Sequence, residues 1–166
     1  MATHRLSVLG PNSVPGAADV FFEPYDVKAT NDVWKMLVCI FNDTATRIGL
    51  RGAFNVPKNY VGTAKLIVVW TSTATSGDCV WDCDYRAVGG NDAESLDQAG
   101  TQESVTVTDA APTAANNRLE ATLTLTSSNL AVDDTVEFEL FRDGAASDTM
   151  AAAAILFDLI FEYADA

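Results

Sequence analysis

The clearest pattern along the chain is an alternation of apolar and polar residues. It runs through Val136–Leu140, Leu119–Leu125 and Trp81–Ala87. A period of two sends successive side chains to opposite faces of a sheet, so that one face is buried and the other meets water. These three segments are therefore predicted to be half-buried β-strands.

Two further segments, Val33–Phe41 and Ala64–Trp70, are apolar on both faces over part of their length. Such runs are typical of strands in the centre of a sheet or at an interface. Shorter strands are expected within 18–23, 46–55 and 103–108.

The segment 151–163 fits two patterns. Alternate residues from Ile155 to Phe161 are apolar, as in a strand, whereas Ile155, Leu159 and Tyr163 share a helical stripe. We favour a strand, because aromatic and branched residues fill the segment and the other expected elements are all β.

Turn-forming clusters, such as Thr75–Asp78, Gly89–Asp92 and Asp143–Ser147, separate these short segments. That arrangement is typical of an all-β sandwich or barrel. We therefore expect the fold class to be all-β, an antiparallel β-sandwich, and specifically a jelly roll of about eight strands.

The N-terminal residues are predicted to form a separate extended arm over 1–17, followed by a single domain over 18–166. Gly10-Pro11 and Val14-Pro15-Gly16 disfavour a helix in the arm. An extended arm of this kind is suited to docking on a neighbouring protein.

The composition of the 166 residues, with 48% apolar and 20% charged side chains, is that of one folded domain. The longest apolar run, Met150–Phe157, is far shorter than the roughly 20 residues that cross a membrane. No membrane partner is expected. The N-terminus lacks the apolar stretch of a secretory signal, so synthesis in a cytoplasm without export by that route is expected.

The formal net charge of −13 is unevenly distributed. Residues 1–65 carry seven Lys and Arg against five acids, and residues 66–166 carry three against eighteen. The acidic body would repel a phosphate backbone, which disfavours nucleic-acid binding. The acidity is explained either by solubility or by docking of the less acidic N-terminal segment onto acidic surface of a neighbouring copy or partner.

The three cysteines are Cys39, Cys79 and Cys83, an odd number in a chain without a secretion signal. Cys79 and Cys83 fall on one face of a strand, about 13 Å apart, beyond disulfide reach. Metal ligation would require partners that no second cysteine or histidine cluster supplies. We therefore favour packing in the core.

Few residues offer catalytic chemistry. The only histidine is His4, in a segment expected to be mobile, which disfavours triads and histidine-bound zinc. Asp82 and Asp84 could form a glycosidase-like pair at roughly 7 Å, but any acidic strand supplies such pairs and we favour a solvated strand face. We expect a protein that is not an enzyme, with no catalytic, cofactor-binding or metal-binding residues and no cofactor.

Two other groups of residues have two explanations each. The acidic loop Asn91–Asp97 could bind calcium through oxygen ligands, or its acids could cap turns in a polar loop, which we favour. The aromatic residues could form a sugar-stacking platform, as in carbohydrate-binding modules, or pack in the core, which we favour. They are Trp34, Trp70, Trp81, Tyr60 and Tyr85.

A longer stretch carries a family resemblance. Residues 54–66 lead into Val69–Asp78 and then into Trp81 and Asp84–Ala87, and residues 94–98, 134–138 and 141–143 add to the likeness. Over roughly residues 18 to 164 the chain resembles small β-sandwich (jelly-roll) accessory proteins of tailed-bacteriophage virions.

The resemblance implies a non-enzymatic structural protein in the virion, made in the host bacterial cytoplasm. Its expected role is a capsid decoration (cement) protein that coats or stabilises the particle, or an appendage module. Its expected partners are the major capsid protein or another virion protein and further copies of itself, and we favour a homotrimer because of the strands that are apolar on both faces.

Two alternatives remain open from the residues alone. A carbohydrate-binding or adhesin module, for example in a phage tail fibre or appendage, would need an exposed aromatic row. A carboxylate enzyme would need two acids facing each other across a cleft.

Overall fold

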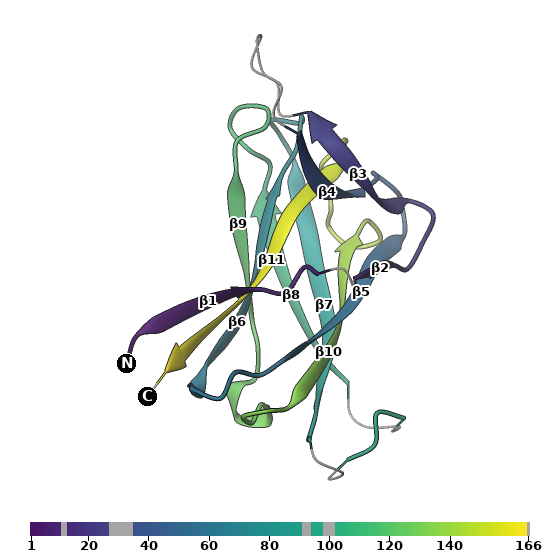
Figure 1. Ribbon diagram of the computed structural model, residues 1–166. Helices are drawn as coiled ribbons and strands as arrows, with labels where there is room; N and C mark the ends of the chain where they lie inside the picture. The colour runs from purple at the N-terminus through teal and green to yellow at the C-terminus, as the bar shows by residue number, and fades with distance from the viewer. Residues whose placement is uncertain (11–12, 27–34, 91–93, 98–101, 166) are drawn as a thin grey trace.

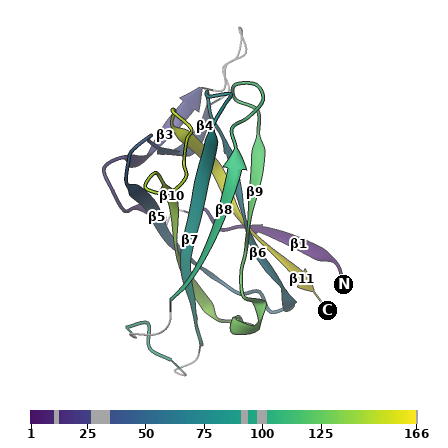
Figure 2. The ribbon, with the colours of Figure 1, turned by 180° about the vertical axis from the view of Figure 1, so that it is seen from behind.

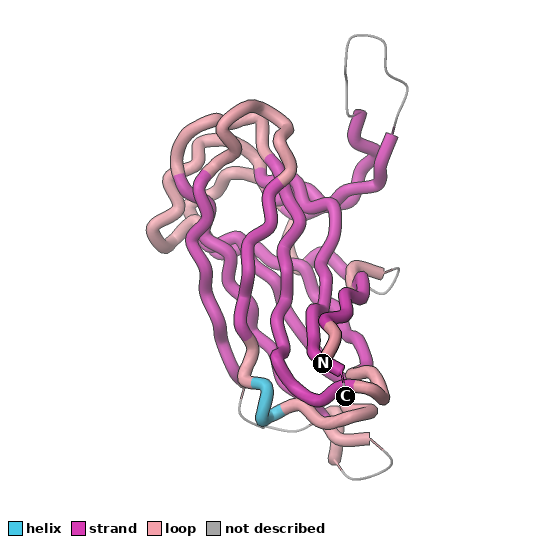
Figure 3. Tube along the Cα trace, turned by 90° about the vertical axis from the view of Figure 1, so that its left-hand side faces the viewer, coloured by secondary structure: helices cyan, strands magenta, loops and turns pink. Residues whose placement is uncertain are grey.

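The protein is a sandwich of two antiparallel sheets, seen in a computed structural model that describes residues 1–10, 13–26, 35–90, 94–97 and 102–165 (Figures 1 and 3). The fold class predicted from the alternation is therefore confirmed. The strands are β1 (Thr3–Ser7), β2 (Val14–Pro15), β3 (Val20–Asp26), β4 (Lys35–Phe41), β5 (Arg47–Asn55), β6 (Tyr60–Thr71), β7 (Asp78–Val88), β8 (Glu103–Ala110), β9 (Leu119–Thr124), β10 (Thr135–Asp143) and β11 (Ala154–Asp165).

The described residues thus contain eleven strands, where about eight were expected. Their one helix is a 3-10 turn at Ser127–Asn129, so the described chain has no helix long and apolar enough to cross a membrane.

Sheet A has the order β3-β4-β11-β6-β9, with β1 also paired to β11, and sheet B has the order β2-β5-β10-β7-β8. Neighbouring strands are antiparallel throughout. The edge strands β8 and β9 lie side by side at one corner of the sandwich (Figure 2).

The N-terminal segment is extended where it is described, but it is joined to the sandwich. β1 pairs with the last strand, from Thr3 opposite Ala164 to Ser7 opposite Ile160, and β2 pairs with β5. The two chain ends consequently lie side by side (Figure 1). Residues 1–17, which were predicted to form a separate arm, therefore contribute two strands, β1 and β2, to the sandwich.

In the three strands predicted to be half-buried, apolar side chains point into the core and polar side chains point outward. In β10, Val136, Phe138 and Leu140 are buried between the sheets, while Glu137 and Glu139 face outward. A buried Leu or Phe of this kind contributes roughly 1.5–3 kcal/mol through removal of apolar surface from water. β7 and β9 follow the same rule, so all three half-buried strands are confirmed.

The two segments predicted to be apolar on both faces lie inside sheet A. β6 runs between β11 and β9, and β4 runs between β3 and β11, although residues 33 and 34 of the predicted strand lie outside the described residues. On the outer face of β4, Val38 and Ile40 pack with Ile155 into a second cluster. Their own chain therefore covers these side chains, and the homotrimer that they suggested stays a prediction.

The last segment is a strand, as favoured, and a β-bulge explains why a helical pattern also fits it. Leu156 pairs with Trp70 and Asp158 with Val69, so Phe157 is an extra residue in β11. The bulge shifts the alternation, and Leu156 and Leu159 are both buried in the core although they are three positions apart.

The three cysteines are free and buried in the core cluster, which confirms the packing interpretation. Burial raises the pKa of Cys39 to about 12 and raises the pKa of Cys79 and of Cys83 as well. A buried thiol held neutral in this way is inert.

Candidate functional site

The outer face of sheet B is built from the polar halves of three alternating strands. Glu139 of β10 stands opposite Arg51 of β5 on one side and opposite Asp84 of β7 on the other. Because the inward half of each strand is held in the core, these outward groups sit on a rigid sheet.

One arginine joins the acids of β7. Arg47 Nε lies 3.2 Å from Asp82 Oδ2, and Arg47 Nη1 lies 2.8 Å from Asp84 Oδ2. The hydroxyls of Ser104 and Thr106 on β8 also donate to Asp84 and Asp82. Both carboxylates are thus satisfied within the sheet.

This arrangement disfavours the glycosidase pair that the sequence left open. The hydrogen bond from Arg47 lowers the pKa of Asp84 below its ordinary value, against the opposing effect of burial. A general acid needs a raised pKa so that it keeps its proton near neutral pH. The two acids share a strand face as predicted, but their geometry is that of an ion-pair network.

The same arginine covers the aromatic ring on this face. Its guanidinium carbon lies 3.6 Å from the ring centroid of Phe141, a cation–π contact. The ring lies over Gly49, where a Cβ would come within 2.5 Å of Phe141 Cδ1. Phe141 is therefore packed between the sheet and Arg47.

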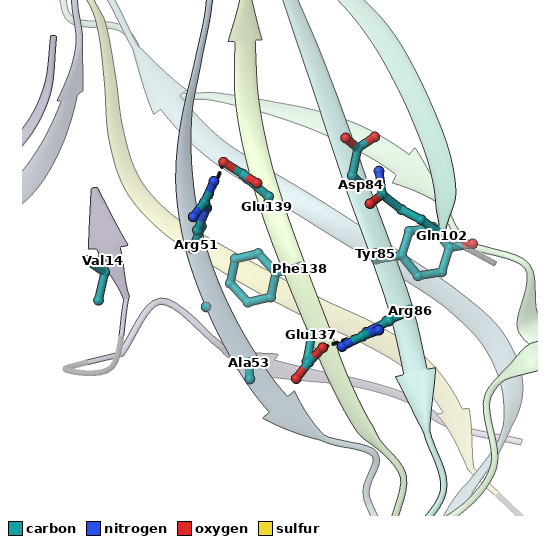
Figure 4. A pocket seen from close by; sticks show the side chains of 11 residues that line it. Val14, Arg51, Ala53, Asp84, Tyr85, Arg86, Gln102, Glu137, Phe138 and Glu139 are labelled. Atoms are coloured by element: carbon teal, nitrogen blue, oxygen red, sulfur yellow. Dashed lines mark hydrogen bonds and ion pairs between the residues drawn. The ribbon is translucent and has the colours of Figure 1, made fainter. Parts of the chain in front are cut away.

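A groove of about 590 Å³ crosses this face of the sheet (Figure 4). We call it the sheet B groove. It is lined by Val14 of β2, residues 51–53 of β5, 137–139 of β10, 84–86 of β7 and Gln102. Its volume falls within the roughly 300–1,000 Å³ range of ligand sites.

Two ion pairs fix the charged groups of the groove, as the dashed lines in Figure 4 mark. Arg51 Nε lies 2.9 Å from Glu139 Oε1, and Arg86 Nε lies 2.6 Å from Glu137 Oε2. In the part of the chain that is described, Glu137 Oε1, Glu139 Oε2 and the two Nη atoms of Arg51 have no partner. Acceptors and donors for a ligand therefore lie next to one another.

The predicted aromatic groups belong to the core, as favoured. Trp70, Trp81, Tyr60 and Tyr85 are all buried, and Trp34 lies outside the described residues. Trp70 donates its indole N–H to Asp109 Oδ2 at 2.9 Å, and the Tyr85 hydroxyl donates to Glu103. The described members of the set therefore form no surface platform.

The acidic loop is described only from residue 94 to residue 97. Glu94 Oε2 accepts the backbone N–H of Gly89 at 2.8 Å, which is a turn-capping role. Within the described ranges, no three His, Cys, Asp or Glu side chains gather in a way that could hold a metal ion.

The expectation of a mobile His4 is wrong. His4 lies in β1, its Nε2 is 2.7 Å from Asp165 Oδ2, and its ring stacks on Tyr163 with centroids 5.4 Å apart. Pairing of β1 with β11 brings these residues together, although they are far apart in sequence.

The N-terminal cations meet acids of the C-terminal half within the same chain. Arg5 Nε lies 2.8 Å and Lys65 Nζ 3.1 Å from the carboxylate of Glu162, which is almost fully buried. Arg5 also reaches Glu120 at 3.1 Å. Docking of the N-terminal segment onto a neighbouring protein stays a prediction.

No family model matches the chain, and no curated protein matches its sequence. Solved structures do match its fold. A family 35 carbohydrate-binding module from Cellvibrio japonicus Abf62 aligns over 99% of this chain and 95% of its own, at 12% identity and a TM-score of 0.51. The family 11 carbohydrate-binding module from Clostridium thermocellum, in complex with a β-1,3-1,4-mixed-linked tetrasaccharide, aligns over 96% and 94%, at 10% identity and a TM-score of 0.50.

An exo-β-agarase gives a TM-score of 0.56 at 10% identity over 98% of this chain, which spans only 25% of that enzyme. At these identities the likeness concerns the fold. The chain is therefore an antiparallel β-sandwich that resembles the jelly-roll fold of carbohydrate-binding modules.

Proposed function

We propose that the protein is a non-catalytic carbohydrate-binding module that holds an oligosaccharide of neutral sugars in the sheet B groove. The observation that carries the proposal is the row of donors and acceptors on Arg51, Glu137 and Glu139 that have no partner among the described residues. A sugar hydroxyl both donates and accepts, so neighbouring hydroxyls can bridge a carboxylate oxygen and a guanidinium N–H. Ion pairs join Arg51 to Glu139 and Arg86 to Glu137, so these groups already lie side by side before a ligand arrives.

The charges of the groove and of the whole chain favour a neutral ligand. The groove is lined by two arginines and three carboxylates, on a chain with a net charge of −13. An anionic polysaccharide would meet repulsion, whereas a neutral one forms charge-assisted hydrogen bonds without it. Recognition would rest on hydrogen bonds, because Phe141 is covered by Arg47.

Affinity electrophoresis in gels containing soluble neutral polysaccharides tests the proposal. The intact chain should be retarded by at least one neutral polysaccharide, with little dependence on ionic strength. Arg51→Ala and Glu139→Gln should each weaken binding about tenfold, since each removes a charge-assisted hydrogen bond. Arg118→Ala, at the residue just before β9 of sheet A, is the matched control and should bind normally. Failure on all neutral glycans, or full binding by the groove variants, would contradict the proposal.

The virion role stays a prediction, together with its capsid partner, its homotrimer and its location. It rests on the sequence resemblance, and a glycan-binding module of a phage appendage would be compatible with both ideas. Sedimentation equilibrium of the intact chain tests the oligomer directly, since a single-chain mass would remove the trimer.

A further inference from the structure

A second cavity, of about 670 Å³, lies at the edge of β11 in sheet A. It shares no lining residue with the sheet B groove. Its walls include Leu9, Phe22, Leu37 and Phe157, and Asp158 contributes a carboxylate. We call it the β11 cavity.

The cavity occupies a fork between strands. β4 pairs with β11 only as far as Cys39 opposite Leu156, and β1 joins the same side of β11 from Ser7 opposite Ile160. Between these two points no described strand pairs with β11 on that side. The space left there is filled only in part by the chain that follows β1, whose Val8 N–H donates to Leu159.

The bulge in β11 brings an aromatic ring and a carboxylate to the same cavity. In a regular strand two consecutive side chains point to opposite faces, but Phe157 is the extra residue, and both it and Asp158 line the space. The Phe157 ring is held in turn by an edge-to-face contact with Tyr25 at 6.3 Å.

Two hydrogen bonds to one oxygen orient the carboxylate of Asp158. Its Oδ1 accepts the Ser7 hydroxyl at 2.5 Å and the Leu159 N–H at 2.8 Å. Its Oδ2 has no partner among the residues that the structure describes. Leu37 adds an apolar side chain to the lining, and 68% of its surface is exposed to solvent. An exposed apolar side chain beside a fixed carboxylate is characteristic of a ligand site.

We propose that the β11 cavity binds a small organic amine, that is, a primary ammonium group on an aromatic or aliphatic body. The ammonium would donate to Asp158 Oδ2, and the apolar body would pack against Phe157, Phe22 and Leu37. The charge of the ligand is complementary both to this carboxylate and to the acidic chain as a whole. The site is independent of glycan binding.

Titration with 2-phenylethylammonium, followed by NMR of assigned Leu9, Leu37 and Phe157 signals, tests the proposal. Two compounds with the same ring serve as controls, neutral 2-phenylethanol and anionic phenylacetate. Saturable shifts should appear at the cavity, with affinity for the ammonium at least tenfold above that for the alcohol. Phenylacetate should not bind. Equal affinity for the amine and the alcohol, or shifts located elsewhere, would overturn the proposal.

Two variants separate charge from shape. Asp158→Asn keeps an oxygen for Ser7 and the Leu159 N–H, and it should weaken amine binding at least tenfold. Leu37→Ala trims the exposed rim and should weaken the amine and the alcohol alike. Asp97→Asn, which removes an exposed carboxylate elsewhere, should have no effect. Undiminished binding by Asp158→Asn would overturn the assignment, whatever the outcome of the glycan experiments.

Discussion

Arg142 and Asp148 form a bidentate ion pair inside the protein, with Nε to Oδ2 and Nη2 to Oδ1 both at 2.9 Å. Their side chains are 1% and 3% exposed. Arg142 also donates to the carbonyls of Met150 and Ala152, at 2.5 and 2.6 Å. One arginine therefore anchors the connection between β10 and β11.

Removal of Arg142 should strongly destabilise the folded protein. Arg142→Met leaves Asp148 buried and unpaired, and we expect a loss of about 3–5 kcal/mol in the free energy of unfolding. Arg118→Met is the control, because Arg118 is exposed and its pair with Glu120 is a surface one, for which roughly 0–1 kcal/mol is expected. Urea unfolding followed by tryptophan fluorescence measures both. Equal effects would refute the anchoring role.

Stability should fall in acid. Burial works to raise the pKa of Asp148, but the hydrogen bonds and charge of Arg142 outweigh it and leave that pKa below its ordinary value. Hydrogen bonds from Arg5 and Lys65 likewise lower the pKa of Glu162. The unfolded chain therefore binds these protons more tightly than the folded one.

These carboxylates add to the free energy of unfolding at pH values above their pKa in the unfolded chain, about 4. That stabilisation is lost as the pH falls through their lower pKa values in the folded chain. Urea midpoints should thus be steady from about pH 5 to pH 7 and drop below about pH 4. Asp148→Asn should reduce the slope of that drop. A slope unchanged by the substitution would mean that the pair contributes nothing to acid sensitivity.

Gly49 should be irreplaceable by alanine. A methyl group there would collide with the Phe141 ring, which has Arg47 on its other side, so we expect a loss of roughly 1–3 kcal/mol from overpacking. Gly10→Ala is the matched control, because no atom of the described residues lies within 4 Å of a Cβ built at that position. Thermal unfolding compares the two, and similar melting temperatures would contradict the packing argument.

Deletion of residues 1–7 should destabilise the fold. The truncation removes the pairing of β1 with β11 and leaves Glu162 with Lys65 as its remaining cation. We expect a loss of roughly 1–3 kcal/mol, the scale of hydrogen bonds to a charged group. Thermal and urea unfolding of the truncated chain measure it. If both midpoints were unaltered, the segment would be the independent arm that the sequence suggested.

Most of the sandwich could be predicted from the sequence, because the alternation of apolar and polar residues can be recognised within a single strand, without knowledge of the strands that pair with it. The alternation of Glu137 and Glu139 with buried neighbours located β10, and the aromatic and branched content located β11. The N-terminal strand was missed for the opposite reason. Four of its five residues are exposed and carry no burial pattern, and only pairing with the distant strand β11 makes the segment a strand.

The candidate sites were largely out of reach of sequence reasoning. Arg51 and Glu139 are many residues apart and meet only through strand pairing, and Arg142 occupies a core position that alternation assigns to an apolar residue. The bulge at Phe157 left one trace, since it made a helical stripe fit β11 as well as a strand. An ambiguous period in an otherwise clear strand was the one available signal for the β11 cavity.

Chemical-shift mapping of a neutral oligosaccharide on the isotope-labelled chain tests directly whether the sheet B groove binds a glycan. Glycan binding in the groove should give saturable shifts concentrated on residues 51–53, 84–86 and 137–139, with none at Arg118. Shifts confined to any other surface, or no shifts with any neutral oligosaccharide, would contradict it.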